Sequence, residues 1–235
     1  GLDKMCLIPQ DYLSEAGCTP VTNEEVKRLV DLRPDEFIGF AAVDPHDLEA
    51  PDKLEHAFAD LDLRGLNLHP GRQRFYPMDG CVQGLYDICE RYNRPVMFHT
   101  GMSWEPHTLA KYGRPVEFEE LAETRPRLRF CLGHFGWPWL EEAAMLMVKH
   151  KNVYADTGLL YFDSAREFYA HLFTRELPST WIDRSLRHQV MFGSDSPRFE
   201  QIRMARALDG LGLRESTVEL IRGANALDFL NGLEQ

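Results

Sequence analysis

Four side chains that can bind a metal or carry a proton stand where apolar runs of the sequence end. Short apolar runs are typical of buried β-strands. In a barrel of parallel strands the carboxyl ends all open on one face, so residues about 30 positions apart can meet there. One histidine after a strand is more often a structural residue, but four such residues in successive units favour a shared site. The four are His69 in GLNLHP, His99 in VMFHTG, His134 in CLGHFGW and Asp195 in MFGSDSP.

These residue types predict metal or acid–base chemistry. Neutral imidazole and carboxylate are good ligands for zinc and similar divalent ions. A metal lowers the pKa of a bound water toward neutrality, and Asp195 is suited to take the proton that the water loses. A serine-hydrolase hypothesis is weaker, because Gly193-Ser194-Asp195 lacks the Gly-x-Ser-x-Gly pattern of a nucleophile elbow.

The strands that would position these residues recur at a regular spacing. The ends of the apolar runs lie 31 residues apart on average, which matches a barrel of about 250 residues and eight units. We therefore predict an α/β fold, a (β/α)8 TIM barrel. An open doubly wound sheet is less well supported, because no GxGxxG or Walker loop follows the first run. The predicted strands are 4–9, 37–45, 65–69, 95–99, 128–134, 153–157 and 190–195.

Helical patterns fill the segments between these strands. Thr22 and Glu25 form a capping-box pattern, and Pro51 suits a first helical turn. The apolar residues of 82–89 share one helical face. Only seven strands are countable, so we expect the first strand–helix unit of an eight-unit barrel to lie before Gly1. Further helices are predicted at 139–150, 165–172, 202–211 and 217–230.

Composition limits the partners of the chain. Its 235 residues are 44% hydrophobic and 27% charged, without a break in composition, so we predict a single packed domain over 1–235. The net charge of −11 argues against a nucleic acid or an anionic membrane as the main partner and favours a small molecule. No apolar run is long enough for a membrane span. The five cysteines are an odd number without zinc-finger spacing, which indicates reduced thiols and a cytoplasmic protein.

The motifs together resemble the amidohydrolase superfamily, and specifically the amidohydrolase-2 group related to aminocarboxymuconate-semialdehyde decarboxylase and pyrone-dicarboxylate lactonase. The resemblance spans nearly the whole chain. The segments that carry it are GLDKMCLIP, FIGFAAVDP, RGLNLHP, RPVMFHTG, FCLGHFG, VYADTG and VMFGSDSP, which are similar to strands two to eight of that group, and the terminal GANALDFL.

The resemblance implies one divalent metal ion, zinc being the expected one, bound by His99 and Asp195. His134 would act beside it as a general acid–base, and Asp195 would activate water. Relatives take two further ligands from a His-x-His pair on the first strand, and no such pair occurs in this sequence. A metal-free lactonase or a non-catalytic scaffold is therefore an alternative. Frequent dimers and tetramers in the group imply a homo-oligomer.

The implied activity is hydrolysis of a small cyclic or aromatic carboxylated substrate by a metal-bound water, with non-oxidative decarboxylation as the second possibility. Arg72 or Arg74 could bind the substrate carboxylate through a bidentate contact. Asn67 replaces a lysine that is common in relatives, which argues against a binuclear centre. The predicted substrate-binding residues are His69, Arg72, Trp137 and Asn67.

Overall fold

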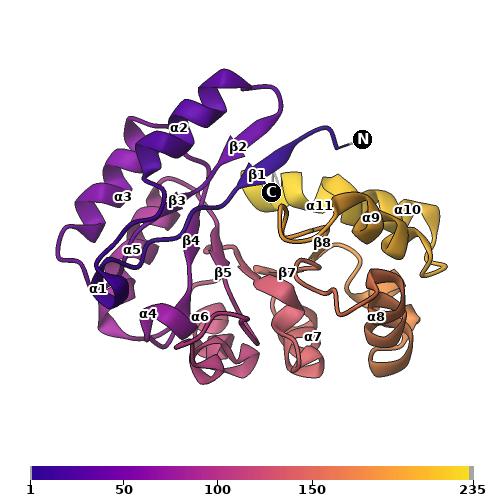
Figure 1. Ribbon diagram of the computed structural model, residues 1–235. Helices are drawn as coiled ribbons and strands as arrows, with labels where there is room; N and C mark the ends of the chain where they lie inside the picture. The colour runs from indigo at the N-terminus through magenta and orange to yellow at the C-terminus, as the bar shows by residue number, and fades with distance from the viewer. Residues whose placement is uncertain (1, 233–235) are drawn as a thin grey trace.

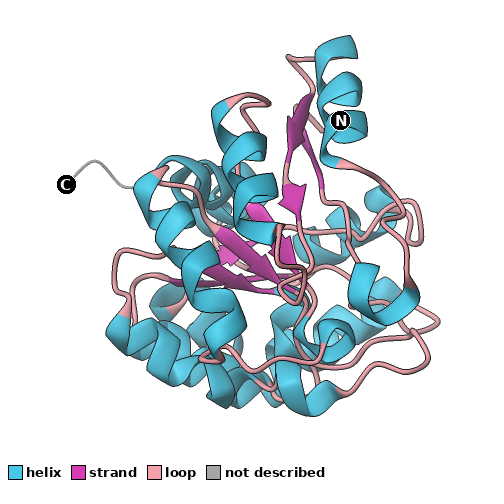
Figure 2. Ribbon diagram, turned by 90° about the vertical axis from the view of Figure 1, so that its left-hand side faces the viewer, coloured by secondary structure: helices cyan, strands magenta, loops and turns pink. Residues whose placement is uncertain are grey.

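Most strands lie side by side in the middle of the molecule with helices around them, and the first two strands extend from the upper edge near the N-terminus (Figures 1 and 2). The computed structural model describes residues 2–232, so Gly1 and residues 233–235 of the predicted domain lie outside the description. Every ladder between the named strands is parallel, and helices separate most strands in the sequence. The predicted α/β class is thereby confirmed.

Each of the seven predicted apolar runs contains a strand, and the second run contains two. Phe40 separates a first part that pairs with β1 from a second part that pairs with β4. The strands form two sheets, one of β1 and β2 and a curved one of β3 to β8, and within residues 2–232 no ladder joins β1 to β8. In chain order the strands are β1 (Met5–Leu7), β2 (Phe37–Gly39), β3 (Ala41–Ala42), β4 (Leu66–Leu68), β5 (Val96–Phe98), β6 (Phe130–Leu132), β7 (Val153–Asp156) and β8 (Val190–Met191).

Local sequence signals mark where two of the longer helices begin. The capping box of Thr22 and Glu25 is present, and Pro51 lies in the first turn of its helix. The predicted helix at 217–230 is interrupted by a π-helical turn at Leu220–Ala224. The α-helices are α1 (Leu13–Ala16), α2 (Asn23–Leu32), α3 (Ala50–Ala59), α4 (Pro70–Gln73), α5 (Gly80–Arg91), α6 (Glu119–Thr124), α7 (Leu140–Lys149), α8 (Ala165–His171), α9 (Gln201–Asp209), α10 (Glu215–Glu219) and α11 (Asn225–Asn231). No described helix combines the length and the apolar character that a membrane crossing needs.

Side chains of the strands pack in two separate clusters because successive residues point to opposite faces. Leu66, Phe98 and Phe130 point outward and pack against the helices. Cys131 and Tyr154 point inward and form a second cluster. The outer cluster attaches the helices to the sheet, and the inner one fills the interior of the curved sheet.

Helix α11 covers this interior at the amino ends of the strands. Asn225 Nδ2 donates to Val190 O at 2.6 Å, which fixes the start of the helix at β8. Arg129 Nε donates to Phe229 O at 2.7 Å, which fixes its end at β6. The rings of Phe229 and Tyr154 lie 5.1 Å apart between centroids. The histidines that follow the carboxyl ends of β4, β5 and β6 therefore lie at the opposite end of the interior.

Phe229→Ala should lower the free energy of unfolding by about 3–5 kcal/mol, because Phe229 is 2% exposed and its loss leaves a cavity beneath Tyr154. Urea unfolding measures the change. Leu227→Ala on the same helix is the control: Leu227 is 50% exposed, and its truncation should change stability by less than about 0.5 kcal/mol. Equal effects of the two substitutions would contradict this packing role.

Candidate functional site

The parallel ladder decides which side chains reach the site. Asn67, Met97, Cys131 and Tyr154 are successive partners in the register of β4 to β7. Inward-facing positions recur every second residue, so the next inward level toward the carboxyl ends lies two residues further along each strand. That level contains His69, His99, Gly133 and Asp156.

His134 joins this level through a change of backbone direction after β6. Gly133 holds the inward position itself, and a Cβ there would lie 2.7 Å from Phe98 O. The next residues, His134 and Phe135, have left-handed φ values of 60° and 52°. Asp156 Oδ1 accepts hydrogen bonds from the backbone N of His134 at 3.2 Å and of Gly158 at 2.7 Å. Asp156 thus holds the backbone of His134.

The three histidines contact one another directly. The rings of His69 and His99 are stacked, with centroids 3.9 Å apart and planes 12° from parallel. His134 Nε2 and His99 Nδ1 are 3.0 Å apart and share a hydrogen bond. Within residues 2–232, three buried nitrogen atoms of this cluster have no partner: His69 Nε2, His99 Nε2 and His134 Nδ1. Buried polar atoms normally have partners, so these atoms are available to a ligand.

Hydrogen bonds determine where the protons lie in this cluster. Arg72 N donates to His69 Nδ1 at 3.3 Å, so neutral His69 carries its proton on Nε2. One proton lies between His99 Nδ1 and His134 Nε2. If His99 donates it, His99 Nε2 has a lone pair and His134 Nδ1 carries an N–H; if His134 donates it, the two free nitrogens exchange these roles. Burial, followed by the nearby His134, lowers the pKa of His69 to about 3. Burial also holds the pKa of His99 well below its ordinary value, with His69 and His134 adding to the effect.

Asp195 lies beside His134 at the end of β8. A Cβ built on Gly158 would lie 3.4 Å from His134 Nδ1 and 3.8 Å from Asp195 N, so both residues flank this glycine. Asp195 has a left-handed φ of 57°. Although the residue is exposed as a whole, burial of its carboxyl group raises its pKa; Asp156 adds to the rise, and His134 opposes it. A carboxyl with a raised pKa can both take and return a proton.

A metal ion at His99 and Asp195 finds only part of its donor set here. His99 Nε2 is an unpartnered imidazole nitrogen, the atom that a divalent metal uses. Nowhere in the described part of the chain do three or more His, Cys, Asp or Glu side chains gather so that they could hold a metal ion. Since a catalytic zinc commonly takes three protein ligands, the described residues do not complete such a centre.

Two of the predicted substrate-binding residues already have protein partners. Arg72 Nε lies 3.0 Å from Glu15 Oε2, and Arg72 Nη1 contacts Glu105 Oε2. Asn67 Nδ2 donates to Pro9 O at 2.7 Å and ties β4 to the segment after β1. Binding of a substrate carboxylate by Arg72 would require the loss of an ion pair, and Asn67 lies one level below the histidines with a structural contact. His69, in contrast, lines a small cavity together with His99, Ser103 and Thr108.

Aromatic side chains from the loops after β5, β6 and β7 pack against one another. Trp137 lies three residues after His134, and its ring centroid is 5.1 Å from that of Phe162. Phe162 is in turn 4.9 Å from Trp104. Trp137 therefore belongs to a cluster of aromatic rings, here called the aromatic wall, and Trp104, which is 43% exposed, forms its outer end. Contact of Trp137 with a substrate stays a prediction.

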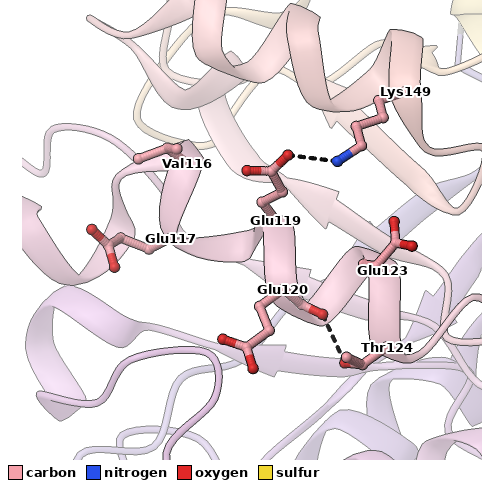
Figure 3. A pocket seen from close by; sticks show the side chains of 7 residues that line it. All are labelled: Val116, Glu117, Glu119, Glu120, Glu123, Thr124 and Lys149. Atoms are coloured by element: carbon pink, nitrogen blue, oxygen red, sulfur yellow. Dashed lines mark hydrogen bonds and ion pairs between the residues drawn. The ribbon is translucent and has the colours of Figure 1, made fainter.

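A separate surface groove lies between α6 and the end of α7 (Figure 3). Glu119 and Lys149 are paired across it at 2.8 Å, and Thr124 Oγ1 donates to Glu120 O at 2.7 Å. Glu117 and Glu123 also line it, so its charge is mainly negative. An acidic groove repels a carboxylated substrate, and this one lies away from the histidine cluster.

Comparison with known proteins gives both a family and a fold. The amidohydrolase family model matches residues 14–232. None of the curated proteins matches the chain. An uncharacterised TIM-barrel protein from Bordetella bronchiseptica has a TM-score of 0.81 at 20% identity, with 97% of this chain and 77% of that chain covered.

Two enzymes share the fold as well. One is 5-carboxyvanillate decarboxylase from Sphingomonas paucimobilis, with a TM-score of 0.67 at 18% identity over 88% of this chain and 70% of that one. The other is a dihydroxybenzoic acid decarboxylase from Polaromonas with bound manganese and 2-nitroresorcinol, with a TM-score of 0.65 at 16% identity over 88% and 73%. These similarities confirm the predicted TIM-barrel fold.

Gly133→Ala should lower the free energy of unfolding by about 1–3 kcal/mol, because the added methyl group meets the carbonyl oxygen of Phe98 and cannot rotate away from it. Gly84→Ala in α5 is the matched control. No atom lies within 4 Å of a Cβ there, so alanine should stabilise the helix by about 0.5–1 kcal/mol. Urea unfolding separates the two, and an unchanged stability of Gly133→Ala would refute the close approach of β5 and β6.

Proposed function

The chain belongs to the amidohydrolase family, in the amidohydrolase-2 group, and from this membership we propose that its histidine cluster carries out acid–base catalysis on a small cyclic or aromatic carboxylic acid. The protein is an enzyme, a hydrolase or a lyase. One observation supports the position of the reaction best: His99 and His134 share a hydrogen bond, and each has a buried nitrogen atom without a partner in the described structure.

Hydrolysis is the reaction that we place first. It needs a base that takes a proton from the attacking water and a donor for the oxygen that gains charge. Asp195, whose pKa is raised, is the proposed base. His69 Nε2 is a buried N–H without a partner in residues 2–232 and would bind a substrate oxygen. His134 Nδ1, beside Asp195, would give a proton to the leaving group and recover it from Asp195, which holds the proton taken from the water.

Non-oxidative decarboxylation is the second candidate. In that reaction the bond between the ring carbon and the carboxylate breaks, carbon dioxide leaves, and the electron pair on carbon takes a proton. Asp195 or His134 would supply the proton. Two of the solved structures that share the fold are decarboxylases of aromatic acids, which favours this reaction for the same residues.

The family, and the manganese bound in one structure with the same fold, suggest a divalent metal ion as cofactor. Element analysis of the purified protein before and after treatment with a chelator tests the suggestion. We expect activity to fall at least tenfold on removal of the ion and to return when the same ion is added back. Full activity in a preparation free of divalent metals would contradict it. His188→Gln, a change at an exposed histidine, should respond to chelation as the natural chain does.

Asp195→Asn and His134→Gln should each lower kcat by about 10²–10⁴-fold, because each removes a group that moves a proton. Assays with a panel of lactones and hydroxybenzoic acids, following ring opening and released carbon dioxide, identify the reaction and the substrate. His188→Gln should leave kcat unchanged. Thermal unfolding of every variant separates loss of catalysis from loss of folding. A correctly folded Asp195→Asn enzyme with natural kcat would refute the assignment.

A further inference from the structure

Arg198 is a cation at the edge of the site whose charge is not neutralised by an ion pair in residues 2–232. It lies three residues after Asp195, and its backbone N–H donates to Asp195 O at 3.1 Å. Its guanidinium carbon is 5.4 Å from the ring centroid of Trp104 and 5.9 Å from that of Phe199. No carboxylate of the described chain pairs with it, so its donors face aromatic rings and solvent.

Arg72, which the sequence predicts to bind the substrate carboxylate, differs from Arg198 because it has ion-pair partners. Two carboxylates, of Glu15 and Glu105, hold its guanidinium, and the ring of Tyr12 lies 3.8 Å from its central carbon. A substrate carboxylate at Arg72 would compete with two protein carboxylates. At Arg198 no ion pair of the described residues would have to break.

Arg198 lies between Asp195 and the aromatic wall. Its backbone N–H donates to Asp195 O at 3.1 Å, so Arg198 and Asp195 lie in the same turn after β8. Through Trp104 it is joined to the aromatic wall of Phe162 and Trp137. A guanidinium presents two parallel N–H groups that match the two oxygens of a carboxylate, and aromatic rings beside it favour a flat, apolar ligand body.

We infer that Arg198 binds the carboxylate of the substrate and that Trp104 lies against the substrate ring, so that these two residues select carboxylated aromatic or cyclic molecules. The inference rests on the proposed function, because it names what holds the substrate of that same site. Arg198 is a specificity residue: it contacts the part of the substrate that identifies it as an acid.

Benzoate and its neutral analogue benzamide test the contact without any assumption about the reaction. Isothermal titration calorimetry should show that Arg198→Gln weakens benzoate binding about 10- to 100-fold, the range expected when a hydrogen-bonded charge loses its partner. Arg198→Lys should recover part of the affinity. Binding of benzamide should be the same in all variants. The matched control is Arg203→Gln, because Arg203 is a nearby arginine that already pairs with Glu200 at 2.7 Å.

The results separate this inference from the proposed function. If a carboxylated substrate is turned over but Arg198→Gln leaves KM and benzoate affinity unchanged, the inference is wrong and the function stands. If no turnover is found but benzoate binding depends on Arg198, the ligand class stands and the reaction is wrong. With an active enzyme we expect KM to rise about 10- to 100-fold and kcat to change less than threefold. Failure of the natural chain to bind benzoate would overturn the inference.

Discussion

Strands β4 to β7 are held in parallel register, with Asn67 beside Met97, Met97 beside Cys131 and Cys131 beside Tyr154. This ladder is the constraint on which the site depends. It places these four side chains at one level inside the curved sheet. Two residues further along the chain, at the carboxyl ends of the strands, the next inward level contains His69, His99 and Asp156. Helix α11 closes the amino end, so the interior opens toward the histidines. A shift of one residue in the register of any of these strands would turn its inward-facing side chains toward the outer helices.

The backbone conformation after β6 determines where the His134 side chain lies. Gly133 occupies the inward position of β6 because only a residue without Cβ fits against Phe98 O. The left-handed residues that follow redirect His134 to His99, and the carboxylate of Asp156 holds the turn by accepting two backbone N–H groups. Burial then keeps His69 and His99 neutral, because a charged imidazole in a poorly solvated place is costly. Each of these two rings therefore has one N–H and one nitrogen lone pair.

The TIM-barrel fold that this chain shares with decarboxylases does not select a reaction, because the same scaffold supports many chemistries. Selection depends on the loops after the strands. Here those loops bring Trp104, Phe162 and Trp137 to one side of the site and Arg198 to its edge. Arg72 and Arg203 are paired with carboxylates, whereas Arg198 has no ion pair among the described residues.

By itself the sequence determined the α/β class, the seven apolar runs that contain strands, and the histidines and Asp195 at the strand ends, because alternation and helical periodicity are local properties of the chain. It also predicted the capping box at Thr22. Only the tertiary structure decided which charges are free: Arg72 meets Glu15, which is 57 positions away, and Glu105. The signal for Arg198, a cation just after Asp195, was present but could not be distinguished from that of Arg72. Pairing between distant residues depends on how loops fold over the barrel, and no local pattern encodes that.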